Sequence, residues 1–200
     1  LPCNGTEYAI PSGAPDFNVQ TIYKGSMKDE IGEEQFRELL KVLCSLQSDL
    51  VLTIPDLPLT GNFIQNRNSM INWCPIGRNA LSRDREQFKA LDKLYRIRTT
   101  YLSTLRKHIA EQGISAIVKL GGNTSFDIYP TGWDKTYALS HFDKSKWEFW
   151  FVGDRCGMEG NDYEIFELLK KSERSFETSG PEETIEIIES YILEVLQYRR

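Results

Sequence analysis

The sequence has no long apolar run and no excess of basic residues. A stretch of about 18 apolar residues would predict a membrane span, and neither such a stretch nor an opening signal-peptide pattern occurs. The 24 basic and 29 acidic residues give a net charge of -5, which provides no general attraction to nucleic acid or anionic lipid. We therefore expect a soluble, cytoplasmic protein that binds neither nucleic acid nor membrane, and in which any basic site is a local cluster.

Cysteine is also scarce, and its spacing excludes two kinds of small scaffold. The chain holds 4 cysteines, and no two of them form a C-x-x-C pair. Neither a zinc site nor a dense disulfide framework is indicated, so we expect free thiols. These residues are Cys3, Cys44, Cys74 and Cys156.

The chain does contain 40% hydrophobic residues, which is enough for a core, and they follow helix and strand periods. Up to Pro130 the pattern predicts an antiparallel sheet backed by helices. The expected elements are a helix over 32–48, a loop over 50–60, two short strands within 62–76 around a turn at 67–69, one long amphipathic helix from Ser82 or Asp84 to Gly113, and strands over 114–120 and 124–130.

After Pro130 the pattern changes to an alternation of helices and buried strands, which is typical of a parallel α/β sheet. The apolar run "WEFWFVG" predicts a strand buried on both faces. In order, we expect a helix start within 132–142, a strand over 147–153, a helix over 161–171, a strand over 174–180 and a helix over 180–197 with Pro181 near its first position.

Two carboxylates flank the glycine-containing loop that follows this run. Asp154 lies at the carboxyl end of the expected strand, where parallel sheets bind ligands, and Asp162 lies at the start of the next helix. The pair suits a hard cation such as Mg²⁺, although an ordinary strand, loop and helix with Asp162 as the helix cap fits equally. Lys135 favours phosphate chemistry nearby, although a lone lysine is more often a solvated surface residue.

A second group of polar residues lies upstream. Arginines gather between Phe63 and Arg85 with one acidic residue among them, and guanidinium groups suit phosphate oxygens. In "TSFDIYP", strand alternation places Ser125 and Asp127 on one face, where they bind sugar hydroxyls or form the hydrated face of a sheet. The clustered arginines are Arg67, Arg78, Arg83 and Arg85.

Three segments, "RNSMINWCPIGR", "GGNTSFDIYPTGWDKTYAL" and "FVGDRCGMEGNDYEIF", together resemble the eukaryotic-type phosphomannomutases of the haloacid dehalogenase superfamily. The resemblance runs from about Asn4 to the last helix. It implies an α/β fold, with an incomplete Rossmann-like haloacid dehalogenase core and an inserted α+β cap of antiparallel sheet and helices. Residues 1–27 and 131–200 would form the core domain, and residues 28–130 the cap domain.

The resemblance also gives roles to the cap residues. Arg78 and Arg85 match the arginines that hold the distal phosphate of the substrate, and Arg67 matches a third substrate-binding arginine. Ser125 and Asp127 match the pair that contacts the sugar phosphate. The resemblance further implies a homodimer formed through the cap.

In the core, the same resemblance implies a catalytic lysine and a metal. Lys135 matches the lysine that steadies an aspartyl-phosphate. Asp154 matches the Mg²⁺ ligand, and Asn161 and Asp162 complete the cation shell, directly or through hydrogen bonds to its ligands. The implied reaction interconverts mannose 6-phosphate and mannose 1-phosphate, with a hexose 1,6-bisphosphate as activator.

Two departures qualify the resemblance. The family's nucleophile lies in an Asp-x-Asp-x-Thr loop, and no such motif occurs in these 200 residues, which begin at Leu1. We therefore expect either that the start of the core is missing or that the chain is a noncatalytic sugar-phosphate-binding module. A sugar-phosphate phosphatase is a further alternative. The family's second cation loop also differs, because "ELLKK" stands where an acidic residue and a threonine are expected.

Overall fold

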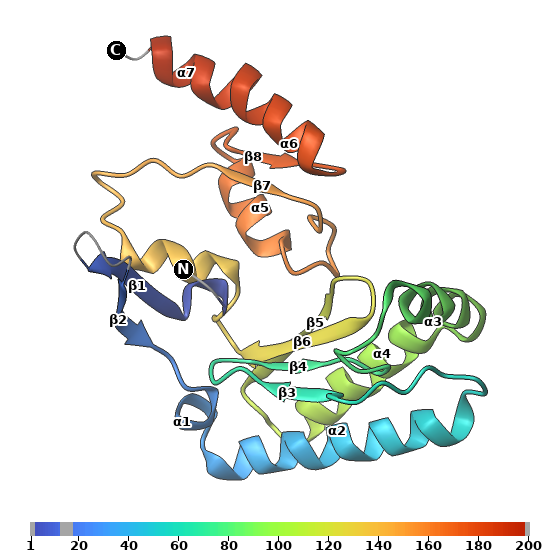
Figure 1. Ribbon diagram of the computed structural model, residues 1–200. Coiled ribbons are helices and arrows are strands. Elements are labelled where there is room, and N and C mark those ends of the chain that lie inside the picture. Colours follow the sequence, from blue (N-terminus) through green and yellow to red (C-terminus); the bar gives the residue numbers. More distant parts are fainter. Residues whose placement is uncertain (1–2, 13–17, 199–200) are drawn as a thin grey trace. The chain divides into compact units, whose positions relative to one another are not determined.

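The computed structural model describes residues 3–12 and 18–198, and the chain divides into two units, residues 1–133 and 134–200 (Figure 1). The boundary lies close to the change in sequence pattern after Pro130. The first unit includes the N-terminal hairpin of β1 (Glu7–Ser12) and β2 (Asn18–Lys24), which pair antiparallel. Assignment of residues 1–27 to the same domain as residues 131–200 stays a prediction.

The first unit contains an antiparallel sheet of four strands in the order β3-β4-β6-β5. Both predicted strand pairs are confirmed, and so is the turn at 67–69. The register places Asn72 opposite Asp127, which in turn lies opposite Lys119. The strands are β3 (Ile64–Asn66), β4 (Ile71–Trp73), β5 (Ala116–Gly121) and β6 (Ser125–Pro130).

Helices supply the rest of the core on one face of this sheet. The helices are α1 (Met27–Ile31), α2 (Glu33–Thr53), α3 (Ser82–Tyr95) and α4 (Ile97–Glu111). Leu39 and Leu43 of α2 and Leu105 of α4 are fully buried against the sheet. Trp73 stacks on Phe126 with ring centroids 4.7 Å apart. Each fully buried leucine side chain contributes roughly 1.5–3 kcal/mol relative to leaving it exposed.

The expectation of one long helix from residue 82 to Gly113 is wrong. Arg96 adopts a left-handed conformation, with φ 54° and ψ 38°, and separates α3 from α4. The Asp92 carboxylate accepts hydrogen bonds from the Arg98 backbone N–H (2.7 Å) and side-chain Nε (2.6 Å). This carboxylate accepts from an N–H at the start of α4 and so stabilises the break between the two helices. The hydrophobic period does not reveal such a local hydrogen bond.

The expected loop over 50–60 is wrong for its first residues, because α2 continues to Thr53. Leu50 is fully buried and extends the apolar face of the helix by another turn. Thr53 Oγ1 donates to the Asp49 carbonyl (2.8 Å). The helix ends at Thr53, and Ile54 is extended (φ -105°, ψ 108°), because the following proline, Pro55, disfavours a helical conformation in the residue before it.

The second unit has a parallel pair of strands, as predicted. β7 (Phe151–Gly153) and β8 (Ser175–Glu177) are joined through α5 (Tyr163–Lys170). The expected strand over 147–153 is confirmed only for its last three residues, and the expected helix within 132–142 is a 3₁₀ helix, Lys135–His141. The final helix comprises α6 (Pro181–Ile187), a π-helical turn (Ile188–Ile192) and α7 (Leu193–Tyr198), with Pro181 at its start.

Two helical layers flank β7 and β8. Ile165 and Leu169 of α5 pack with Phe149 and Phe151. The ring of Tyr191, in the π-helical turn, contacts Phe176 at 5.6 Å between centroids. This arrangement leaves the loops after β7 and β8 at the same end of the pair, because parallel strands share a carboxyl edge.

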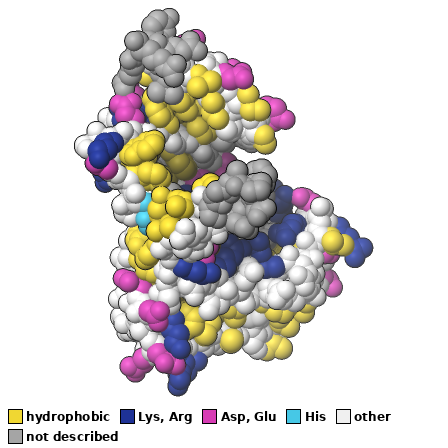
Figure 2. Space-filling model, turned by 60° about the vertical axis from the view of Figure 1, so that its left-hand side comes forward, with side chains coloured by type: hydrophobic (Ala, Val, Ile, Leu, Met, Phe, Trp, Pro, Cys, Tyr) yellow, Lys and Arg dark blue, Asp and Glu magenta, His cyan; other side chains and the backbone are white. Residues whose placement is uncertain are grey.

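None of the described helices is long and apolar enough to cross a membrane. Hydrophobic side chains are nevertheless exposed along the last helix, as the upper part of Figure 2 shows. They include Ile185, Ile188 and Leu193, which are between 39% and 56% exposed.

A substitution at Gly77 tests the packing of the loop between β4 and α3. Its φ is +90°, and a Cβ there would lie 2.0 Å from the Gly61 carbonyl oxygen. We expect Gly77→Ala to lower the free energy of unfolding by about 2 kcal/mol or more, because strain and a backbone clash combine. The measurement is the urea midpoint of the 200-residue chain.

Gly113→Ala is the matched control for this substitution. Gly113 also has positive φ (+61°), but no heavy atom lies within 4 Å of the added Cβ. Its cost should be about 1 kcal/mol, from the left-handed conformation alone. Equal losses in the two variants would contradict the packing described for Gly77.

Candidate functional site

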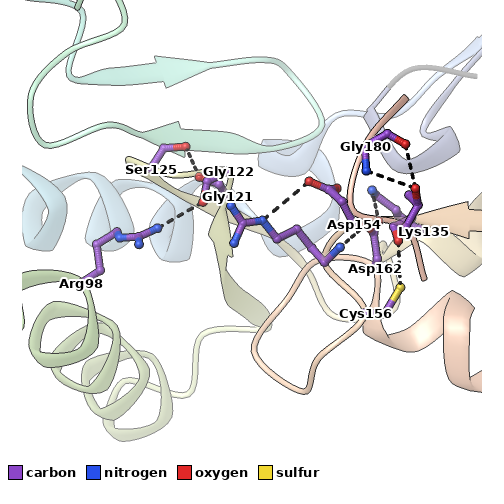
Figure 3. Close-up of polar contacts among 12 residues, drawn as sticks. Arg98, Gly121, Gly122, Ser125, Lys135, Asp154, Cys156, Asp162 and Gly180 are labelled. Carbon is purple, nitrogen blue, oxygen red and sulfur yellow. Dashed lines mark hydrogen bonds and ion pairs between the residues drawn. The ribbon is translucent and has the colours of Figure 1, made fainter. Parts of the chain in front are cut away.

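The Asp162 carboxylate is the centre of the polar cluster in the second unit. Its side chain is buried, and the Asp162 residue is only 1% exposed. One oxygen accepts a hydrogen bond from the Lys135 ammonium, and the other accepts from the Arg155 backbone N–H at 3.0 Å (Figure 3). The alternative in which the Asp162 side chain caps the next helix is wrong, because it makes no capping hydrogen bond to α5.

Glycine is required at two positions of the loop that carries this carboxylate. A Cβ on Gly153 would lie 2.7 Å from Asp162 Oδ2, and one on Gly160 would lie 2.0 Å from the Arg155 carbonyl oxygen. The Gly160 N–H donates to the Gly157 carbonyl at 2.7 Å, which closes a turn within the loop. The loop thus folds closely enough to bring the start of α5 back against the end of β7.

Asp154 differs from Asp162 in being open to solvent. It follows directly after β7, its side chain is 68% exposed, and its ion-pair partner is Arg155 Nε at 3.9 Å. The residue lines a cavity of about 500 Å³ at the carboxyl ends of β7 and β8. Thr178, Ser179 and Gly180, which follow β8, line the same cavity and did not figure in the sequence prediction. The sequence feature that could have predicted them is their place at the end of the expected strand, just before Pro181.

These residues offer a divalent cation one accessible carboxylate. Asp162 is already engaged by Lys135 and Arg155, while Asn161 is half-buried beside it. Within residues 3–12 and 18–198 there is no group of 3 or more His, Cys, Asp or Glu side chains that could hold a metal. Mg²⁺ is commonly held by one or two carboxylates together with water and substrate phosphates. The residues present therefore fit Mg²⁺ bound in that way, and they do not fit a metal site in which every ligand comes from the protein.

Cys156 lies in the same loop and is not a thiolate at neutral pH. Its side chain is buried, with Sγ 3.4 Å from the Gly153 carbonyl oxygen. Burial, together with the negative charge of the neighbouring carboxylates, first that of Asp162, raises the pKa of the Cys156 thiol to about 11. A neutral, buried thiol is a poor nucleophile and a poor metal ligand.

The predicted arginines of the first unit occupy three different loops or helix ends. Arg85, in the first turn of α3, donates from Nη1 to Thr124 Oγ1 at 3.0 Å, next to Ser125. Arg67 lies at the β3–β4 turn and donates from Nε to Gln65 Oε1 at 3.1 Å. Arg78 is exposed in the loop before α3. The N-cap of this helix is Leu81, and not Ser82 or Asp84 as the sequence suggested; Asp84, at the third helical position, accepts from the Leu81 N–H at 2.8 Å.

Ser125 and Asp127 lie on the sheet face opposite Phe126 and Ile128, as strand alternation predicts. Ser125 is 5% exposed, and its hydroxyl donates to the Gly121 carbonyl at 2.7 Å (Figure 3). Asp127 is half-buried and accepts from Asn72 Nδ2 at 2.7 Å. This face is therefore not simply a hydrated surface. Asn72 did not figure in the sequence prediction, although a polar residue between Ile71 and Trp73 in a strand indicates a side chain on the face opposite the core.

The chain is similar to several known proteins. A family model for eukaryotic phosphomannomutase matches residues 13–194. The phosphomannomutase of Saccharomyces cerevisiae is 37% identical over 160 residues, which cover 79% of this chain and 59% of that protein. The phosphomannomutase of Schizosaccharomyces pombe is 41% identical over 138 residues, which cover 68% of this chain and 51% of that protein.

Among solved structures, an N-terminally truncated, IMP-bound IMP-nucleotidase from Plasmodium falciparum aligns with a TM-score of 0.51 and 16% sequence identity. The alignment covers 88% of this chain and 43% of that one. At this identity the likeness bears on the fold alone.

The protein thus has an α/β fold, with an antiparallel sheet backed by helices in the first unit and a parallel pair of strands flanked by helices in the second, and its family implies the haloacid dehalogenase type of fold. Within that class, the chain belongs to the eukaryotic phosphomannomutase family. The chain spans between half and two thirds of the length of the curated relatives it matches.

The Lys135–Asp162 ion pair should be important for the stability of the second unit. We expect Lys135→Ala to cost about 3 kcal/mol of local stability, because it leaves a buried carboxylate without its counter-ion. Hydrogen exchange at the amides of β7 and α5 measures the loss. Lys170→Ala is the control, since the Lys170–Glu167 pair (3.2 Å) is exposed and should be worth under about 1 kcal/mol. Equal protection in both variants would show that the pair does not stabilise this unit.

Proposed function

We propose that this chain provides the substrate-binding and phosphate-binding residues of a phosphomannomutase, which interconverts mannose 6-phosphate and mannose 1-phosphate through an aspartyl-phosphate. The observation that carries this proposal is the pairing of Lys135 with the buried Asp162, beside the exposed Asp154 at the end of a parallel strand. Membership of the phosphomannomutase family supports it. No Asp-x-Asp-x-Thr motif occurs in the 200 residues, so we assign them binding and charge stabilisation and not the nucleophilic attack.

In phosphoryl transfer, positioning and charge stabilisation supply most of the rate enhancement. We assign to Lys135 the neutralisation of the transferring phosphoryl group, with Asp162 holding its ammonium in place. Asp154 would hold Mg²⁺, with Asn161 and Asp162 in supporting roles. When bound, the ion would offset negative charge on the phosphoryl oxygens.

Within the first unit, we assign phosphate binding to the arginines. Guanidinium groups bind phosphate oxygens in a forked geometry, so Arg78 and Arg85 would hold the distal phosphate and Arg67 would assist. Ser125 and Asp127 would contact the sugar. A grip on a second phosphate favours a mutase over a phosphatase, and a hexose 1,6-bisphosphate fits as activator because it carries both phosphates.

We further propose that the protein forms a homodimer through the cap. A cavity of about 440 Å³ lies between α2 and the edge strand β3, lined mainly by apolar residues, among them Val51, Leu52, Phe63 and Ile64. Leu52 is 82% exposed. Exposed apolar side chains beside an unpaired strand edge favour association with a second copy.

Mannose 1-phosphate binding tests the phosphate clamp without requiring a nucleophile. We expect the 200-residue chain to bind mannose 1-phosphate, and Arg85→Ala to lose roughly 2–3 kcal/mol of that binding, typical of a charged hydrogen bond. Arg85→Lys should not restore it fully, because an ammonium cannot hold two oxygens in a fork. Titration calorimetry at modest ionic strength is the measurement.

Arg83→Ala is the matched control for the phosphate clamp. Arg83 lies in the same turn of α3, but its side chain is 83% exposed and approaches only Asp84, at 3.5 Å. Its loss should change affinity little. Equal effects of the two alanine substitutions would assign these arginines to general surface charge.

The metal proposal is tested with Mn²⁺, which substitutes for Mg²⁺ and is visible by electron paramagnetic resonance. We expect Asp154→Ala to weaken Mn²⁺ binding on the order of 10-fold or more, because it removes the accessible carboxylate. Glu167→Ala, on the exposed face of α5, is the control. If Mn²⁺ bound equally well to the wild type and the Asp154 variant, Asp154 would not be the ligand.

A further inference from the structure

Asn72 lies at the middle of the polar row that crosses the four-stranded sheet. In register, Gln65 of β3 faces Asn72, Asn72 faces Asp127, and Asp127 faces Lys119 of β5. The Asn72 residue is 2% exposed, and both of its neighbours in β4 are fully buried. The backbone that carries this amide is therefore held firmly by the core on the opposite face of the sheet.

The orientation of the Asn72 amide follows from its neighbours. Its Nδ2 donates to Asp127 Oδ1 at 2.7 Å and lies 3.4 Å from the Phe126 carbonyl oxygen. Both neighbours are acceptors, so a flipped amide would set oxygen against oxygen at each contact. The Oδ1 atom must therefore point away from Asp127. This buried oxygen has no hydrogen-bond partner among the described residues.

A buried amide oxygen without a partner is costly, so the amide at this position is explained by what its Nδ2 does, which is to donate to Asp127. The close approach of Gly121 shows that the Asp127 carboxylate is also fixed in position. A Cβ at Gly121 would lie 2.7 Å from Asp127 Oδ2, so the carboxylate lies directly over the backbone of β5. Asn72 and Gly121 thus hold Asp127 from two neighbouring strands.

We propose that Asn72 is a positioning residue of the sugar site: its amide holds the Asp127 carboxylate in one orientation, in which that carboxylate accepts a hydrogen bond from a hydroxyl of the hexose phosphate. This inference depends on the proposed function, because it takes the sugar to bind on the polar face of the sheet. A carboxylate held in a fixed position provides an acceptor for a sugar hydroxyl, and this acceptor distinguishes a sugar from phosphate alone.

The experiment compares mannose 1-phosphate with inorganic phosphate as calorimetric ligands. Asn72→Ala should weaken mannose 1-phosphate binding about 10-fold or more, the usual effect of losing a hydrogen bond to a charged site. We expect inorganic phosphate to bind at the arginines or at Lys135 and not at Asn72 or Asp127, so its affinity should not change. A purely structural role of Asn72 would weaken both ligands together.

Gln47→Ala is the matched structural control. Gln47 is also a buried amide, but it belongs to α2, which packs on the core face of the same sheet, where it donates to the Pro75 carbonyl and accepts from Trp73 Nε1 at 2.8 Å. This variant should lose thermal stability while keeping the ratio of the two ligand affinities.

Asn72→Asp gives a second readout that does not depend on truncating the side chain. A carboxyl group in place of the amide would lie against Asp127, and two such groups share a proton with a raised pKa. Binding should be weak at neutral pH and should recover, relative to wild type, as the pH falls and a protonated carboxyl can again donate to Asp127.

The outcomes separate this inference from the proposed function. Wild type that binds no mannose 1-phosphate would overturn both. Wild type that binds it, with an Asn72→Ala variant of equal affinity or of equal loss for both ligands, would overturn only the role of Asn72. A selective loss for the sugar phosphate, with the pH dependence of Asn72→Asp, would support it.

Discussion

The buried carboxylate of Asp162, at the start of α5, joins two other segments of the second unit: the start of the 3₁₀ helix through Lys135, which is 27 residues away, and the loop after β7 through the Arg155 N–H. A carboxylate this deeply buried is tolerated only when its charge and lone pairs are matched. The glycines at 153 and 160 are consequences of that requirement, because any side chain there would displace the loop that provides the match.

The same constraint explains why the two acids of this loop differ in chemistry. Asp162 has its hydrogen-bonding capacity taken up inside the protein, whereas the Asp154 side chain is 68% exposed at the carboxyl edge of β7. One carboxylate thus organises the site, and the other is available to a ligand. A buried ion pair of this kind often adds little net stability compared with apolar packing, but it fixes one geometry, which phosphoryl transfer requires.

In the first unit, the corresponding constraint is the alternation of side chains along β4 and β6. Trp73 and Phe126 stack within the core, which forces Asn72 and Asp127 to the opposite face. Helix α3 begins where Asp84 satisfies the Leu81 N–H, and this start brings Arg85 to Thr124 at the turn before β6. Core packing and helix capping therefore position the polar groups that we assign to the sugar phosphate.

The sequence by itself determined the element types, the antiparallel and parallel regions, and the positions of Asp154, Lys135 and the arginines, because periodicity and strand ends are local properties. The break at Arg96 has a short-range partner in Asp92 that hydrophobic periodicity does not show, and the pairing of Lys135 with Asp162 was decided by tertiary structure. Asn72 was missed for the same reason: its role depends on a register partner 55 residues away. Local patterns show which face a side chain takes, but only the packed sheet decides what stands opposite it.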